Sequence, residues 1–269
     1  MYFDVKGKQV FASTGGNPLD DRKPTIIFLH GSGLDHTFWR LHSRFFATHD
    51  YAVLVPDLPG HKHSEGPALT SIEAMADWLN DVVEMLDARN ISLVAHSQGC
   101  LVTLEFASRY PARLRSVSFI ASGLATPVNE LLLNAAENDP DAAIRMMLGW
   151  SFGSAGHMHQ GQIPGNSMVA GGREVMFGSA PNTLAADLNA CNAYKHGVAA
   201  AKNVSGPIQV LVAGKDRMAP KKATDELIEH LTNPEVSVIA ESGHMIPQEV
   251  PDQCRVLLKT FILANNPAA

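Results

Sequence analysis

The stretch that decides the fold is ISLVAHSQG, residues 91–99. Its first half is apolar and typical of a buried strand, and residues 100–104 continue it with a helical pattern. A serine between small residues on a sharp strand-to-helix turn is prominent enough to act as a nucleophile, as in the motif G-x-S-x-G. Ala95 replaces the first glycine of that motif, which adds one methyl group. By itself the stretch therefore allows two interpretations of Ser97, a nucleophile or a helix cap.

The composition predicts a globular protein with a large core. The chain has 269 residues, 45% of them hydrophobic and only 18% charged. A net charge of −6 gives no indication of a nucleic-acid partner, and no apolar run is long enough to span a membrane. The N-terminus lacks the pattern of a secretory signal, and the three cysteines are widely spaced, as in reduced proteins. We expect a cytoplasmic protein with a small-molecule partner, and the sequence leaves its oligomeric state unknown.

Short apolar strands alternate with amphipathic helices on both sides of the opening stretch. Residues 2–14 predict an antiparallel hairpin at a sheet edge. Further strands are predicted at 24–29, 51–55, 91–95, 114–121, 208–212 and 236–239, and helices near 37–48, 72–86, 100–109, 223–231 and 254–262. This alternation predicts an α/β fold with a mostly parallel, eight-stranded sheet flanked by helices.

The alternation is interrupted between residues 123 and 205. This segment contains five methionines and several glycine-rich pieces, and its helical periodicity survives only near 129–137, 142–150 and 183–194. We interpret 123–205 as a cap inserted into a core domain made of 1–122 and 206–269. The methionines would give the cap an adaptable apolar lining, although packing against the core is the simpler role for each of them.

Two later residues have the chemistry that a serine nucleophile requires. A serine hydroxyl needs a base, and the base needs an acceptor that orients it. Asp216 comes just after one predicted strand, and His244 lies in the loop after the next. Because these loops open at the same edge of a parallel sheet as Ser97, we expect the three side chains to converge.

Five motifs, in the same order, resemble those of the α/β-hydrolase superfamily, specifically its capped serine hydrolases. They are HGSG at 30–33, DLPGH at 57–61, AHSQG at 95–99, GKDRMAP at 214–220 and GH at 243–244. The resemblance implies a catalytic triad in which Ser97 attacks an acyl carbon, His244 transfers its proton and Asp216 orients the imidazole. It also implies an oxyanion hole made by the backbone N–H groups of Ser32 and Gln98.

Other conspicuous residues indicate structural roles. We expect Asp57 to fix its loop, and His96 to project away from Ser97 and to be structural. The H-x-H pairs at 61–63 and 157–159 have no carboxylate or cysteine close by in sequence, so no metal site is predicted. No G-x-G-x-x-G motif follows an early strand, so no dinucleotide cofactor is predicted either.

The resemblance implies hydrolysis of a carboxylic ester, or of a thioester or lactone, in a small and largely apolar substrate. Hydrolysis of a carbon–carbon bond in a diketone-type substrate is an alternative, because the HGSG loop is similar to that of such enzymes. A non-catalytic small-molecule receptor with the same fold also stays open. The superfamily's haloalkane dehalogenases and epoxide hydrolases have Asp where this chain has Ser97, and its hydroxynitrile lyases have Lys near the histidine, so these activities are disfavoured.

The predicted cap offers three cations that could meet a carboxylate on the substrate. They are Arg145, Arg173 and Lys195. A solvated position on the surface is the more common role of such residues, and the sequence does not separate the two.

Overall fold

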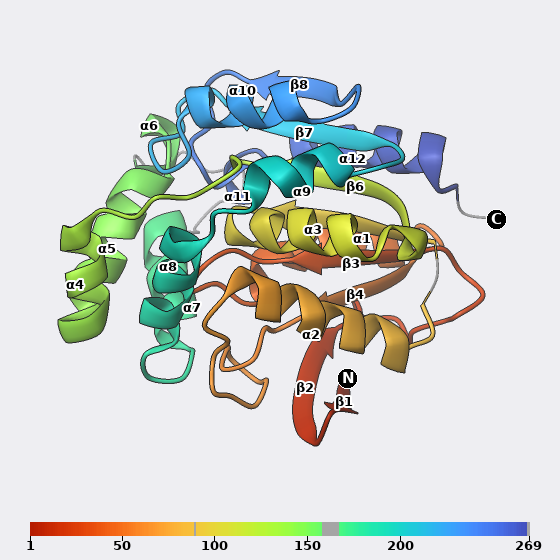
Figure 1. Cartoon of the computed structure of the whole chain (residues 1–269), viewed down its shortest axis with the longest axis horizontal. Coiled ribbons are helices and arrows are strands. Elements are labelled where there is room, and N and C mark those ends of the chain that lie inside the picture. The colour runs from red at the N-terminus through yellow and green to blue at the C-terminus, as the bar shows by residue number, and fades with distance from the viewer. Residues whose placement is uncertain (89, 158–166, 268–269) are drawn as a thin grey trace.

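A single sheet forms the centre of the molecule in the computed structural model, which describes residues 1–88, 90–157 and 167–267 (Figure 1). Its eight strands follow the order β1-β2-β4-β3-β5-β6-β7-β8. Strands β1 and β2 form an antiparallel hairpin, β2 is antiparallel to β4, and all other neighbours are parallel. The predicted sheet is confirmed, with bounds β1 Tyr2–Val5, β2 Lys8–Ser13, β3 Thr25–Leu29, β4 Ala52–Pro56, β5 Ile91–His96, β6 Leu114–Ile120, β7 Ile208–Ala213 and β8 Glu235–Ile239.

Helices cover both faces of the sheet, which explains the continuous apolar runs of its central strands. Strand β3 is buried along its whole length. Ile27 and Leu29 belong to one core cluster with residues of α2 (Ile72–Met85), α3 (Gln98–Arg109), α9 (Gly197–Asn203) and α10 (Lys221–His230). Ile26 and Phe28 belong to the opposite cluster, with residues of α1 (Arg40–Ala47) and α12 (Pro251–Asn265). The short helices η1 His36–Trp39 and α11 Ile246–Glu249 complete this layer, and η2 Pro111–Arg113 follows α3 on the other side.

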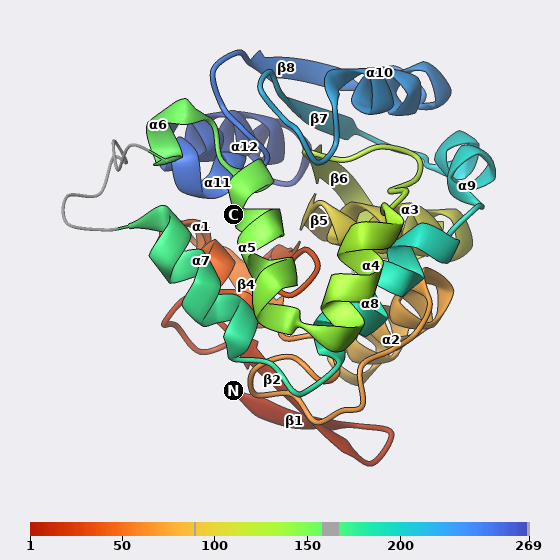
Figure 2. The same ribbon diagram turned by 90° about the vertical axis from the view of Figure 1, so that its left-hand side faces the viewer.

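Between β6 and β7 the chain forms helices that lie over the carboxyl ends of the parallel strands (Figures 1 and 2). They are α4 Glu130–Asn138, α5 Pro140–Ser151, α6 Ser154–His157, α7 Met168–Phe177 and α8 Thr183–Ala193. The three predicted helical stretches correspond to α4, α5 and α8. Helix α9, by contrast, lies beside α3 on the flank of the sheet. The division into core and cap remains an interpretation.

The turn after β5 has the backbone that the opening stretch suggests. Ser97 lies in the positive-φ region, with φ 53° and ψ −121°. It occupies the N-cap position of α3, but within the described residues its side chain makes no capping hydrogen bond. A methyl group at Gly99 would lie 2.8 Å from the carbonyl oxygen of His30 and 2.9 Å from that of Leu29. Ala95 is fully buried in the core, where its methyl group is accommodated.

We expect the substitution Gly99→Ala to lower the free energy of unfolding by about 1–3 kcal/mol, because the new methyl group would press on fixed backbone. Gly149→Ala is the matched control, because Gly149 lies in helix α5 with nothing within 4 Å of the added atom. That change should stabilise the protein by about 0.4–1 kcal/mol. Urea unfolding followed by tryptophan fluorescence measures both. Equal effects of the two substitutions would contradict the close approach at Gly99.

Candidate active site

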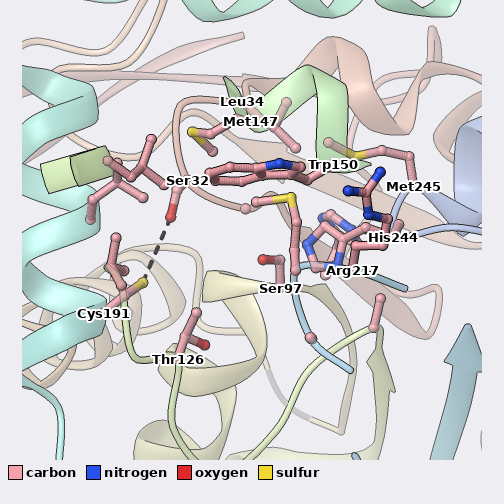
Figure 3. A pocket seen from close by; sticks show the side chains of 18 of the residues that line it. Ser32, Leu34, Ser97, Thr126, Met147, Trp150, Cys191, Arg217, His244 and Met245 are labelled. Atoms are coloured by element: carbon pink, nitrogen blue, oxygen red, sulfur yellow. Dashed lines mark hydrogen bonds between the residues drawn. The ribbon is translucent and has the colours of Figure 1, made fainter. Parts of the chain in front are cut away.

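A pocket of about 160 Å³ lies where helices α4, α5 and α8 meet the carboxyl ends of the strands (Figure 3). From the sheet side it is lined by Ser32, Ser97 and His244, which follow β3, β5 and β8. The helices contribute mainly apolar side chains, namely Leu132, Met147, Trp150, Leu188 and Cys191. The pocket is therefore enclosed by two parts of the chain that are distant in sequence.

The structure brings the three residues of the predicted triad together. Ser97 and His244 both line the pocket (Figure 3). Nδ1 of His244 lies 2.8 Å from Oδ2 of Asp216, and both side chains are buried. The other oxygen of Asp216 accepts hydrogen bonds from the backbone N–H groups of Met218 and Ala219, each at 2.8 Å. With Nδ1–H donating to a fixed carboxylate, Nε2 of His244 is left as the proton acceptor.

His96 has a structural role, as expected, but it does not point out of the site. It lines the pocket, and its Nε2 lies 3.0 Å from the carbonyl oxygen of His244. Burial, followed by the nearby His244, lowers the pKa of His96 well below its ordinary value. His96 is therefore neutral at physiological pH, and it holds the backbone of the loop that carries His244.

The two residues of the predicted oxyanion hole differ in their position relative to the pocket. Ser32 lines the pocket, and its hydroxyl lies 3.7 Å from the thiol of Cys191 (Figure 3). Gln98 is fully buried and is not among the lining residues. Its side-chain amide donates to the carbonyl oxygen of Asp187 at 3.3 Å. Within the described part of the chain, no protein acceptor takes up the backbone N–H of either residue.

The loop-fixing role expected for Asp57 is confirmed. Its Oδ1 accepts hydrogen bonds from the backbone N–H of His36 at 2.7 Å and from the His36 ring at 2.9 Å. Asp35, His36 and Asp57 are also the one group in the described ranges that could bring three metal ligands within 4.8 Å of one another. Because Asp57 and His36 already hydrogen-bond to each other, we assign this group no metal.

The H-x-H histidines differ in their surroundings. His61 is buried, with Nε2 2.9 Å from the carboxylate of Asp187. Sequence analysis missed this partner because 126 residues separate the two. His63 packs against Phe11. His159 lies outside the described residues.

The three cysteine thiols are buried and free, as the spacing of the cysteines suggested. Burial raises the pKa of Cys100 and of Cys191 to about 12, and that of Cys254 is also raised. The thiols are therefore protonated at neutral pH, which disfavours them as nucleophiles.

None of the three cations singled out in the predicted cap lines the pocket. Arg145 and Arg173 both pair with Asp141, and the Lys195 ammonium donates to the carbonyl oxygen of Asn192. Arg217 lines the pocket instead, on the His244 side (Figure 3). It is exposed, and within the described residues its guanidinium has no hydrogen-bonding or ionic partner. Its position next to Asp216 was the signal that sequence analysis overlooked.

No helix in the described ranges is both long and apolar enough to cross a membrane. Comparison with known proteins adds a family match, because a model described as "Alpha/beta hydrolase family" matches residues 26–255. An uncharacterised protein of Mycobacterium tuberculosis is 31% identical over 105 residues, which are 38% of this chain and 30% of that protein. The chain thus spans less than a third of the length of this curated relative.

Two solved structures share the fold. An enol-lactonase from Burkholderia xenovorans superposes with a TM-score of 0.87 at 19% identity, over 97% of this chain and 99% of that one. An esterase from Thermogutta terrifontis superposes with a TM-score of 0.84 at 20% identity, over 98% and 97% of the two chains. At these identities the likeness concerns the fold alone.

Proposed function

Because the chain belongs to the α/β-hydrolase family, we propose that this enzyme is a serine hydrolase that cleaves a carboxylic ester, a thioester or a lactone. The observation that carries the proposal is the shared pocket of Ser97 and His244, with the His244 ring held by Asp216 at 2.8 Å. The fold neighbours include an enol-lactonase and an esterase, which is in keeping with acyl chemistry.

In the proposed mechanism Ser97 Oγ attacks the acyl carbon, and its proton passes to Nε2 of His244. Asp216 stabilises the imidazolium that forms. The N–H groups of Ser32 and Gln98 stabilise the negative charge on the carbonyl oxygen. His244 then returns the proton to the departing alcohol or thiol. Water, deprotonated by His244, releases the acid from Ser97 and restores the enzyme.

The pocket restricts the substrate to a small molecule that is mostly apolar. Its walls present Leu34, Met147, Trp150, Met218 and Met245. Methionine and tryptophan adapt to apolar groups of different shape. Arg217 adds a positive charge to this lining, and it would face the end of a substrate that extends past His244. We propose that a negative charge is accepted at that end.

Replacing Ser97 by Ala should abolish turnover of 4-nitrophenyl butyrate and labelling by a fluorophosphonate probe, because no other activated hydroxyl lines the pocket in the described residues. A fall in kcat of at least about 10⁴-fold is expected for loss of the nucleophile. Thr126→Ala is the control, since Thr126 lines the same pocket without a part in the proposed chemistry. Full activity of the Ser97→Ala protein would refute the mechanism.

The activity should depend on pH through the base. An imidazole must be neutral to accept a proton, so kcat/KM is expected to rise from acidic towards neutral pH and then to level off. Initial rates on one ester across pH 5 to 9, in buffers of constant ionic strength, measure this. A flat profile over that range would argue against a histidine base.

Arg217→Gln should lower kcat/KM for a 4-nitrophenyl hemisuccinate about threefold to fivefold, because an exposed ion pair contributes up to about 1 kcal/mol. Turnover of neutral 4-nitrophenyl butyrate should be unchanged. Lys215→Gln is the charge-matched control, since Lys215 is exposed and does not line the pocket. An equal loss on both esters would mean that Arg217 does not select for charge.

A further inference from the structure

Asp187, on helix α8, contacts both loops that flank the proposed oxyanion hole. Its Oδ2 accepts a hydrogen bond from the backbone N–H of Gly33 at 2.7 Å. Its own carbonyl oxygen accepts one from the side-chain amide of Gln98 at 3.3 Å. Gly33 directly follows Ser32, and Gln98 directly follows Ser97. One residue from the helices above the sheet therefore joins the loop after β3 to the turn after β5.

Asp187 is fully buried, and its charge has a buried partner. Nε2 of His61 lies 2.9 Å from Oδ2 of Asp187, and Nδ1 of His61 lies 3.2 Å from the carbonyl oxygen of Pro59. Both ring nitrogens thus face acceptors, as the doubly protonated imidazolium requires. Burial lowers the pKa of His61, but the Asp187 carboxylate, the Pro59 carbonyl and the charge of Asp57 together outweigh this and the pKa is raised. Removing either partner of such a pair is costly.

The peptide groups on both sides of Ser32 are held in place. The N–H of Leu34 donates to the carbonyl oxygen of Gly31 at 3.1 Å, which fixes the peptide that carries the Ser32 N–H. The bond from Gly33 to Asp187 fixes the next peptide. Gly33 itself has a φ of +66°, and a methyl group there would lie 2.9 Å from Leu184, also on α8. Helix α8 therefore determines the conformation of this loop.

We propose that Asp187 is a positioning residue that aligns the two oxyanion-hole donors, an inference that rests on the proposed function. It does not line the pocket, so it acts through Gly33 and Gln98. Donors of this kind accelerate a reaction only when they are already aimed at the developing charge. The oxyanion hole is thus aligned only while α8 is packed on the sheet, and a helix outside the sheet layers contributes indirectly to catalysis.

The substitution Asp187→Asn tests this with little change in shape. It removes the charge that pairs with His61 and weakens the acceptor for Gly33. The expected result is a fall in kcat of about 10- to 100-fold, with KM within about twofold, because the defect affects the transition state. Asn189→Ala is the control on the same helix, since it removes hydrogen bonds to Glu137 at 3.2 Å and to the carbonyl oxygen of Ala185 at 3.0 Å, neither of which lines the pocket. It should leave kcat within about twofold of the native value.

The rate must be expressed per active site to separate positioning from folding. Titration with a fluorophosphonate counts competent sites, and kcat is divided by that count. A purely structural role would reduce the number of sites and leave kcat per site unchanged. That result in a folded Asp187→Asn protein would overturn the inference. The Asp187→Asn protein should also bind a trifluoromethyl ketone more weakly, in parallel with its lower kcat. The ketone forms a tetrahedral adduct whose negative oxygen needs the same two donors.

If the Asp187→Asn protein does not fold, Gln98→Met decides the question. It keeps the length of the side chain and the backbone N–H, and it removes the amide that binds the α8 carbonyl. Unchanged kcat per site would then overturn the inference.

The variant Ser97→Ala keeps the two proposals distinguishable. Full activity there refutes the serine mechanism itself, whereas an inactive Ser97→Ala with a fully active Asp187→Asn refutes only the role of Asp187.

Discussion

The close approach of the turn after β5 to the loop after β3 is the constraint on which the rest of the site depends. Ser97 adopts φ 53°, and its N–H donates to the carbonyl oxygen of Ile120 on β6 at 3.1 Å. A methyl group at Gly31 would lie 3.0 Å from Cβ of Ser97, and one at Gly99 would meet the end of β3. Glycine at these positions lets two parallel strands end against one another. The proposed nucleophile Ser97 and the proposed oxyanion donor Ser32 consequently line the same pocket.

Three buried carboxylates around this site are each hydrogen-bonded to a histidine. Asp216 accepts hydrogen bonds from two backbone N–H groups as well as from His244. Asp57 stabilises its loop by its hydrogen bond with His36. Asp187 and His61 form a third pair, which lies between the sheet and α8. Such pairs are unfavourable to break, so they specify one arrangement of the loops more strongly than apolar contacts would. The adaptable part of the pocket is its lining of methionine and tryptophan side chains.

The layers of the molecule were predictable because each strand is bounded by local signals. Strand β3 is a short apolar run after Pro24. Helix α2 begins at Ile72, directly after Ser71, whose hydroxyl caps the helix by accepting from the N–H of Ala74 at 3.1 Å. The segment between β6 and β7 was less predictable. Its helices α4, α5 and α8 have the expected periodicity, but their packing over the pocket depends on contacts with distant residues, and α9 joins the flank of the sheet instead.

The sequence by itself determined the alternation of strands and helices and the placement of Ser97, Asp216 and His244 at strand ends, because hydrophobic period and turn residues are local properties. It also determined that Ala95 replaces a glycine, which the structure accommodates in the core. Only the tertiary structure decided which distant groups meet. Arg217 rather than Arg145 lines the pocket, His61 pairs with Asp187, and Gln98 reaches helix α8. These contacts join residues far apart in sequence, so local sequence patterns do not predict them.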